Sequence, residues 1–586
     1  MLEPLVPATL NFREGTPYSE VFGDVYHNAN GGIPKKRHVF LAGNGLPERW
    51  AGRERFVIFE TGFGPGLNFL VTLEAWRRDP ARCARLHYVA IEKHPFTLAD
   101  LQTLHARYDV DAAELHARWP TLVPGAHRIE MDGGKVVLTL LFGDIALVRD
   151  LRLSADAFYL DGFSPAKNAD MWSPQVMRAL ARLAAPGATA ATWSVAASVR
   201  AALEATGFAI EKRQGYGEKK EMLVARYLKG TPASAPKRSA TVIGAGLAGA
   251  AVCERLCARG WEVDLYERHA EPAQEASGNH AGTFHPIVTP DDSVFARLTR
   301  AAFLYSAARF KALNARWDPC GVLQLARDAR EEDSQRRAIA ALALPPDYAQ
   351  CVSREEASKH AGVPVSAPGL WFPQAGWIKP RSLVQALLES CGARLRRRFS
   401  TEVGALPAGT VVLANGHEAT TLQRVPDLRL RKVRGQLTHV PQEALDAPHV
   451  VVLRAGMVLP PVEGVCVVGA SYDIDDEDAN SRAESDAGNL QRLAHILGVN
   501  VRSAALGSRV GFRTVSPDRL PVAGRIEGEV YGAFGYGSRG LIWALLAAEL
   551  IASELEGEPL PAEGRLVDAM SPLRFTRRAA ARGLRP

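Results

Sequence analysis

The sequence predicts two α/β domains, each built around a mainly parallel sheet. The chain has 586 residues, which is more than one hydrophobic core normally organises. Short β-rich runs alternate with longer helical patterns on both sides of residue 230, as in parallel α/β sheets. Between the two halves, residues 231–239 have the Pro, Ala and Ser content of an exposed linker. We therefore expect one domain over residues 1–230 and a second over residues 240–586.

The bulk composition excludes several classes of protein. Hydrophobic residues make up 47% of the chain and charged residues 23%, as in globular proteins. The seven cysteines show no C-x-x-C spacing, so we expect reduced structural thiols and no metal site. The N-terminus lacks a secretory signal pattern, and the longest apolar stretch, residues 541–555, contains two glutamates. These features predict a cytoplasmic protein that does not enter a membrane.

A glycine-rich turn follows the first clear strand of the N-terminal half. The apolar run 56–59 leads into Glu60, and Gly62, Gly64 and Gly66 then alternate before a helical segment. Glycines allow a ligand to approach the backbone, and the next strand ends at Glu92, which is placed to accept hydrogen bonds from ribose hydroxyls. The spacing differs from that of pyrophosphate binders, which favours a nucleoside cofactor without a diphosphate. The alternative is a purely structural glycine turn.

Two further strands of this half are followed by aspartates. Asp144 is expected to accept the amino group of adenine, because ligands bind at the carboxyl edge of open α/β sheets. Asp161 lies in a loop rich in aromatic and polar residues, where it would hold an amine substrate. Asn168 in the same loop is the second candidate for this role. For either aspartate, a loop cap is the alternative interpretation.

The C-terminal half begins with a dinucleotide-binding pattern. Gly244, Gly246 and Gly249 form a G-x-G-x-x-G turn between a strand and a helix, and Glu267 ends the next strand. We expect the pyrophosphate at the helix N-terminus and the adenosine ribose at Glu267, which disfavours NADP.

Later segments of this half favour FAD over NAD. The run 411–416, VVLANG, looks like a flavoprotein strand. Near the C-terminus, Gly537 and Gly540 precede a long apolar helix whose N-terminus would face the flavin ring. A glycine-rich hairpin is the alternative.

Five segments resemble a known family, the bacterial bifunctional proteins of 5-methylaminomethyl-2-thiouridine biosynthesis. The segments are ETGFGPGLNFL (60–70), LDGFSPAKNADMW (160–172), GYGEKKEMLVARY (215–227), ASGNHAGTFHP (276–286) and VGFRTVSPDRLPVAG (510–524). The resemblance implies a Rossmann-like class I methyltransferase domain that uses S-adenosylmethionine. It also implies an FAD-binding domain of the glycine oxidase and D-amino-acid oxidase type, with an α+β substrate region.

The resemblance further implies a tRNA substrate and two consecutive reactions at the wobble uridine. FAD-dependent oxidation would remove the carboxymethyl group of 5-carboxymethylaminomethyluridine, and methylation of the aminomethyl product would follow. Arg513 would then bind the substrate carboxylate, with Arg539 as a competing candidate. Basic residues at 394–398, at 429–434 and in the C-terminal tail are expected either to contact the tRNA backbone or to form solvated faces.

Two other functions stay open. The first is a small-molecule enzyme that oxidises and methylates glycine-like amines, which predicts activity on free amino acids. The second is a tRNA-binding scaffold with one inactive site, which predicts that a cofactor is bound but not turned over.

Overall fold

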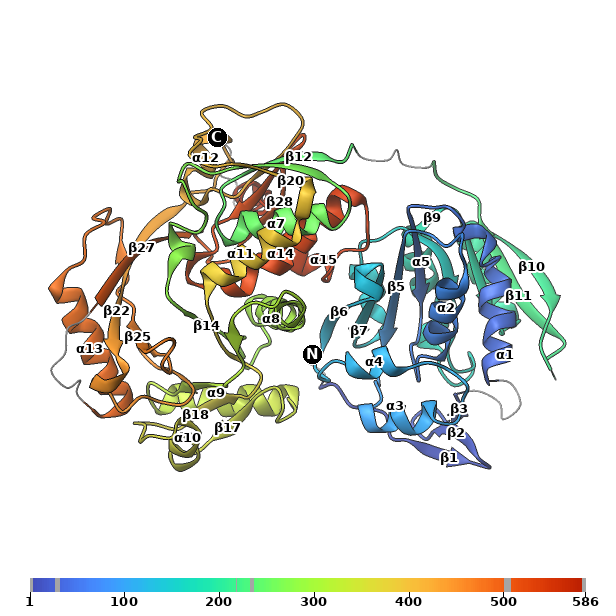
Figure 1. Ribbon diagram of the computed structural model, residues 1–586. Coiled ribbons are helices and arrows are strands. Elements are labelled where there is room, and N and C mark those ends of the chain that lie inside the picture. Colours follow the sequence, from blue (N-terminus) through green and yellow to red (C-terminus); the bar gives the residue numbers. More distant parts are fainter. Residues whose placement is uncertain (1–3, 27–31, 218, 232–236, 500–506, 582–586) are drawn as a thin grey trace. The chain divides into compact units, whose positions relative to one another are not determined.

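The computed structural model describes residues 4–26, 32–217, 219–231, 237–499 and 507–581 (Figure 1). The chain divides into two compact units. One comprises Pro4–Ala235 and Leu555–Arg565, and the other comprises mainly Pro236–Glu554 and Leu566–Pro586. Most of the predicted linker, residues 232–236, lies outside the described residues. No helix in the described part of the chain is long and apolar enough to cross a membrane.

The N-terminal unit is built on an eight-stranded sheet within the described residues, with the order β10-β11-β9-β8-β4-β5-β7-β6. The five central strands are parallel, and β6, β11 and β10 are antiparallel to their neighbours. The strands are β4 (Arg55–Glu60), β5 (Arg85–Glu92), β6 (Gly125–Met131), β7 (Val136–Phe142), β8 (Ala155–Tyr159), β9 (Ala184–Thr192), β10 (Phe208–Gln214) and β11 (Glu221–Tyr227).

Both faces of this sheet are covered, because the central strands are apolar on both sides. Along β4, Phe56 and Ile58 join one hydrophobic core, while Val57 and Phe59 join the core on the opposite face. The helices are α1 (Gly32–Lys36), α2 (Leu67–Arg78), α3 (Leu98–His105), α4 (Ala113–Ala117), α5 (Pro174–Leu183) and α6 (Ala197–Thr206). A small sheet of β1 (Asn11–Arg13), β2 (Thr16–Ser19) and β3 (Asp24–Val25) precedes them.

A segment from near the C-terminus completes this unit. Leu555–Arg565 lies in the predicted domain 240–586 by sequence, yet it groups with the N-terminal unit. The buried Glu558 carboxylate lies 3.6 Å from Arg85 Nε and 3.5 Å from His87 Nε2, both on β5. Arg128 on β6 donates a hydrogen bond of 2.9 Å to the carbonyl of Pro559. Along the sequence, the chain therefore returns to the N-terminal sheet after most of the residues of the second unit.

The second unit contains a six-stranded sheet of the order β20-β13-β12-β21-β29-β28, parallel except for β28. Its strands are β12 (Ser239–Ile243), β13 (Glu262–Tyr266), β20 (Leu395–Arg398), β21 (Thr410–Leu413), β28 (Val522–Glu527) and β29 (Val530–Phe534). Helix α7 (Leu247–Cys257) follows β12, and α14 (Gly540–Glu556) follows β29. This sheet corresponds to the predicted dinucleotide-binding fold.

A second, mostly antiparallel sheet of nine strands forms the α+β region of this unit. Helix α13 (Ala483–Leu497) packs on β22 and β25 (Figure 1). The strands are β16 (Val322–Leu325), β17 (Gln350–Val352), β18 (Gly369–Phe372), β22 (Arg431–Pro441), β23 (Val451–Leu453), β24 (Met457–Val458), β25 (Val465–Gly469), β26 (Asp473–Ile474) and β27 (Gly507–Val515).

The remaining elements connect these sheets. Three short strands form a separate sheet: β14 (Gly282–Phe284), β15 (Trp317–Asp318) and β19 (Gly376–Ile378). The other helices are α8 (Val294–Ala312), α9 (Ala329–Leu342), α10 (Arg354–Ala361), α11 (Pro380–Ser390), α12 (Ala419–Leu422), α15 (Gly564–Met570) and α16 (Arg574–Ala581).

Candidate active sites

The glycine turn after β4 opens onto a pocket of about 330 Å³ in the N-terminal unit. Gly64 and Gly66 adopt φ values of 51° and 73°, which favour glycine. The amide of Gly64 donates a hydrogen bond of 2.7 Å to Glu92, and the amide of His94 donates another of 2.7 Å to the same carboxylate. Glu92 thus fixes the turn against the end of β5.

Six of the predicted residues line this pocket: Gly62, Gly64, Glu92, Asp144, Asp161 and the second candidate Asn168. Asp144 forms an ion pair of 3.0 Å with Lys93. Burial acts against the charged form of Asp144, but the amide of Ala146 and the Lys93 ammonium hold its pKa below the ordinary value.

Gly66 and Glu60 are not among the residues that line the pocket. Gly66 precedes α2, and a Cβ there would lie 2.7 Å from the Phe63 ring. Glu60 is fully buried and accepts hydrogen bonds from Tyr88 Oη at 2.8 Å and Asn68 Nδ2 at 2.5 Å. Burial and the nearby Asp161 raise the pKa of Glu60 to about 8.

Lys36 is the main residue of this site that the sequence analysis missed. Its ammonium forms a buried ion pair with Asp161, which also accepts a hydrogen bond of 2.8 Å from Asn68. Burial would raise the pKa of Asp161, but Lys36, with Asn68 and Lys35, holds it below the ordinary value. Lys36 is the last residue of α1, and no motif spacing connects it with a residue 125 positions later.

Aromatic rings form further parts of the pocket wall. Phe22 stacks on Phe163 with ring centroids 4.6 Å apart, and Tyr26 contacts Phe163 edge-on. On another side, the ammonium groups of Lys35 and Lys219 lie 5.5 and 5.0 Å from the centre of the Trp193 ring. Flat aromatic walls with cations beside them suit a nucleoside and a nucleobase.

The second unit has a cavity of about 990 Å³ along its glycine turn. Gly244 has a φ of 104°, and a Cβ there would lie 2.7 Å from the carbonyl of Ala414. A Cβ on Gly249 would lie 1.8 Å from the carbonyl of Gly244, so the helix packs against the turn. Gly246 instead faces the cavity, and its Cβ would approach only Ser277 Oγ, at 3.3 Å. The space at Gly246 fits a pyrophosphate that approaches the backbone.

The other predicted cofactor residues lie around the same cavity. Glu267 accepts hydrogen bonds from the amides of Ala245 at 2.8 Å and His269 at 3.0 Å, and it lines the cavity. Gly537 and Gly540 line the cavity where α14 begins. The cavity thus reaches from the glycine turn to a helix N-terminus, as an extended dinucleotide requires.

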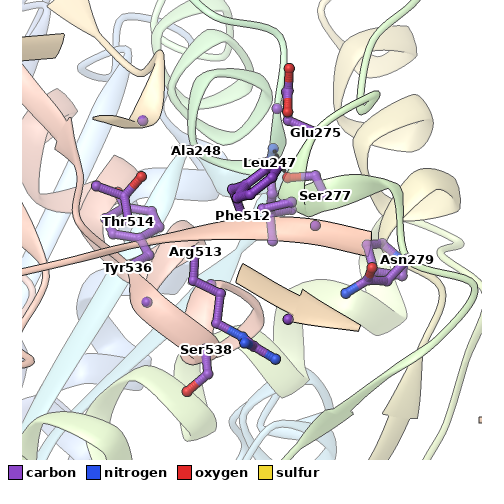
Figure 2. A pocket seen from close by; sticks show the side chains of 18 of the residues that line it. Leu247, Ala248, Glu275, Ser277, Asn279, Phe512, Arg513, Thr514, Tyr536 and Ser538 are labelled. Carbon is purple, nitrogen blue, oxygen red and sulfur yellow. Dashed lines mark hydrogen bonds between the residues drawn. The ribbon is translucent and has the colours of Figure 1, made fainter. Parts of the chain in front are cut away.

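Arg513 extends from one face of β27, and Phe512 and Thr514 extend from the other (Figure 2). All three residues line this cavity. The guanidinium fills the space left by Gly435, where a Cβ would lie 2.1 Å from Arg513 Nη1. Nη1 donates a hydrogen bond of 3.2 Å to the carbonyl of Ser471. Burial lowers the pKa of Arg513.

Arg539 lies in the same cavity, and burial lowers its pKa to about 10. Its guanidinium lies 5.7 Å from the centre of the Phe295 ring. Within the described residues, neither Arg539 nor Arg513 forms an ion pair with a carboxylate. Two partly buried guanidinium groups without an ion-pair partner are suited to bind an anionic substrate group.

The predicted basic patches are mostly neutralised by neighbouring acids. Arg396 pairs with Asp264 at 2.7 Å, and Arg431 pairs with Asp475 at 3.0 Å. The inclusion of Arg434 in a surface patch was wrong, because its side chain is fully buried and bonded to backbone carbonyls. Residues 582–586 of the basic tail lie outside the described residues. No cluster of three or more His, Cys, Asp or Glu side chains that could hold a metal occurs in the described ranges.

These two cavities define a bifunctional enzyme that combines a flavin-dependent oxidoreductase with a methyltransferase. Residues 239–554 match the FAD dependent oxidoreductase family, and residues 107–227 match an S-adenosyl-L-methionine-dependent methyltransferase family. Glycine oxidase from Bacillus cereus ATCC 14579 is 20% identical with a TM-score of 0.48, over 57% of this chain and 98% of the oxidase. The two family matches assign FAD and S-adenosylmethionine as the cofactors of the two units.

Full-length relatives are also known. The tRNA 5-methylaminomethyl-2-thiouridine biosynthesis bifunctional protein MnmC of Azoarcus sp. (strain BH72) is 47% identical, over 98% of this chain and 99% of the relative. The MnmC protein of Paraburkholderia phytofirmans (strain DSM 17436 / LMG 22146 / PsJN) is 45% identical over the whole of both chains. The chain belongs to the MnmC family of bifunctional tRNA modification proteins.

Proposed function

We propose that this protein performs two consecutive reactions on the wobble uridine of tRNA. The substrate is 5-carboxymethylaminomethyl-(2-thio)uridine, and the product is 5-methylaminomethyl-(2-thio)uridine. One observation carries the proposal: the charges of the two cavities match the two substrates in turn. The oxidoreductase cavity contains the partly buried guanidinium groups of Arg513 and Arg539, which suit a carboxylate, and the methyltransferase pocket contains Asp161, which suits an ammonium.

In the oxidoreductase, which we assign to residues 240–586, Arg513 would bind the substrate carboxylate. FAD, when bound in this cavity, would supply the acceptor for a hydride from the carbon between this carboxylate and the secondary amine. Hydrolysis of the resulting imine releases glyoxylate and leaves a primary aminomethyl group. Gly244, Gly246, Gly249, Glu267, Gly537 and Gly540 would hold the cofactor. Dioxygen is the proposed reoxidant.

In the methyltransferase, assigned to residues 1–230, Asp161 would hold the aminomethyl group. S-adenosylmethionine supplies the methyl group, and a free lone pair on the amine is required to accept it. Gly62, Gly64, Glu92 and Asp144 would bind the cofactor from the pocket wall. Glu60 and Gly66 would act from below it, by holding the turn and α2. The segment Leu555–Arg565 supports the same sheet.

The full-length similarity to tRNA modification proteins favours this proposal over a small-molecule amine oxidase fused to an N-methyltransferase. We place the protein in the cytoplasm, where its tRNA substrate is made. The decisive experiment is mass spectrometry of wobble nucleosides from cells that lack the protein. The carboxymethylaminomethyl nucleoside should accumulate there, and the gene should restore its conversion. Unchanged wobble nucleosides together with oxidation of free glycine-like amines would favour the small-molecule enzyme.

A further inference from the structure

Two carboxylates share one amide at the wall of the methyltransferase pocket. Asn68 Nδ2 lies 2.5 Å from Glu60 Oε1 and 2.8 Å from Asp161 Oδ2. Glu60 is fully buried, and the Asp161 side chain is 16% exposed. Two carboxylates that accept hydrogen bonds from the same nitrogen lie close together, and their negative charges repel when water is largely excluded. One of the two groups therefore keeps a proton.

The surroundings of the two carboxylates differ in charge. Glu60 faces the hydroxyl of Tyr88 and no cation contacts it among the described residues. Asp161 forms an ion pair with Lys36, whose side chain is itself only 10% exposed. The proton therefore has a preferred location: the pKa of Glu60 is raised to about 8, mainly by burial, and that of Asp161 is lowered.

We propose that Lys36 is a positioning residue that keeps Asp161 negatively charged while Glu60 holds the proton. The proposal rests on the proposed function of Asp161 as the amine-holding residue. Other titratable groups near the pair are Lys35, Lys219, Tyr88 and Tyr159. The two tyrosines stay neutral because burial raises their pKa values, so lysines are the cations that distinguish the two carboxylates.

The charge on Asp161 matters at two stages of methyl transfer. The substrate ammonium first binds the carboxylate and then loses one proton to solvent, which frees the nitrogen lone pair. That lone pair forms the new N–C bond, while the electrons of the S–C bond remain on sulfur. The product nitrogen is again positively charged, and Asp161 offsets this charge. A protonated Asp161 would neither attract the ammonium nor stabilise the product.

The test is the pH dependence of methyl transfer to aminomethyl tRNA at saturating S-adenosylmethionine. Lys36→Met removes the cation. The pH below which the rate of methyl transfer falls, which marks the acid limb of the profile, should therefore rise by about one to three units, and the rate should recover at high pH. Lys36→Arg retains the charge and should keep the limb near its wild-type position. Lys212→Met is the matched control, because Lys212 pairs with Glu221 on an exposed strand. Its profile should be unchanged.

A second variant identifies the competing carboxylate. Glu60→Gln added to Lys36→Met removes the repulsion on Asp161, so the acid limb should return toward its wild-type position. Binding of S-adenosylmethionine by the same preparations verifies that the N-terminal unit of each variant is folded.

Three results would overturn the proposal. One is a wild-type acid limb in Lys36→Met, and another is an equal loss of rate at every pH in both Lys36 variants. The third is full methylation by Asp161→Asn, which would refute the proposed function of Asp161 as well. If either of the first two results is found and Asp161→Asn is inactive, only the role of Lys36 is refuted, and the proposed function of Asp161 stands.

Discussion

Replacing Arg513 with lysine keeps a positive charge in the oxidoreductase cavity but removes the planar guanidinium fork. In the structure, one N–H of Nη1 is engaged by the carbonyl of Ser471 at 3.2 Å, while the rest of the group faces the cavity. The lysine side chain is shorter than the arginine side chain, and its ammonium donates from a single nitrogen. It would therefore contact either Ser471 or the substrate carboxylate, but it would not orient the carboxylate in a bidentate pair.

The expected loss of binding energy between Arg513 and the substrate carboxylate corresponds to about one charge-assisted hydrogen bond. Such a bond contributes about 1.5–3 kcal/mol, which is about a ten- to hundred-fold decrease in kcat/KM for oxidation of carboxymethylaminomethyl tRNA. Flavin content should be unchanged, because Arg513 lies on β27 and not in the glycine turn. Methylation of preformed aminomethyl tRNA should also be unchanged, because that substrate has no carboxylate.

The assay measures nucleosides from cells that carry the variant, alongside kinetics of the purified protein. The carboxymethylaminomethyl nucleoside should accumulate. Arg525→Lys, an exposed substitution on β28, is the matched control and should behave as wild type. Accumulation of the primary aminomethyl nucleoside would refute the reasoning, since the block would then lie at methylation. If neither nucleoside accumulates, Arg539 becomes the better candidate for the carboxylate.

Three further predictions concern the cofactor site, the amine site and pH. Gly246→Val should lose bound flavin, seen as loss of visible flavin absorbance, whereas Gly404→Val in an open loop should retain it. Asp161→Asn should bind S-adenosylmethionine but methylate about a hundred-fold more slowly, and wild-type methylation would transfer the role to Asn168. Burial lowers the pKa of His87 from 6.5 to about 4. As the pH falls, the His87 imidazole is therefore protonated in the unfolded chain at a higher pH than in the folded protein. The N-terminal unit should therefore lose stability from about pH 6.5 down to pH 4, measured as a falling Tm, and a Tm independent of pH in this range would contradict the reasoning.

Local patterns in the sequence predicted much of the fold. The strands and helices around both glycine turns are present, as β4 with α2 and β12 with α7. Asp144 and Asp161 follow different strands of the sheet, and both line the same pocket. These features depend on residues close together in sequence, or on the rule that parallel strands end at the same edge.

Contacts between distant residues could not be predicted in this way. Lys36 and Asp161 are 125 positions apart, and only tertiary packing brings their side chains together. The exposure of Arg434 was also misjudged, since a basic run in sequence does not reveal which side chains alternate into a sheet.

The sequence by itself determined the two glycine turns, the acids that follow the parallel strands, and the pairing of an oxidoreductase with a methyltransferase. Tertiary structure alone decided that Glu60 is buried outside the lining of the pocket and that Lys36 forms an ion pair with Asp161. It also decided that Leu555–Arg565 belongs to the N-terminal unit. The physical reason is the range of the interactions. Turn geometry is set by neighbouring residues, whereas burial and ion pairing are set by segments that only packing brings together.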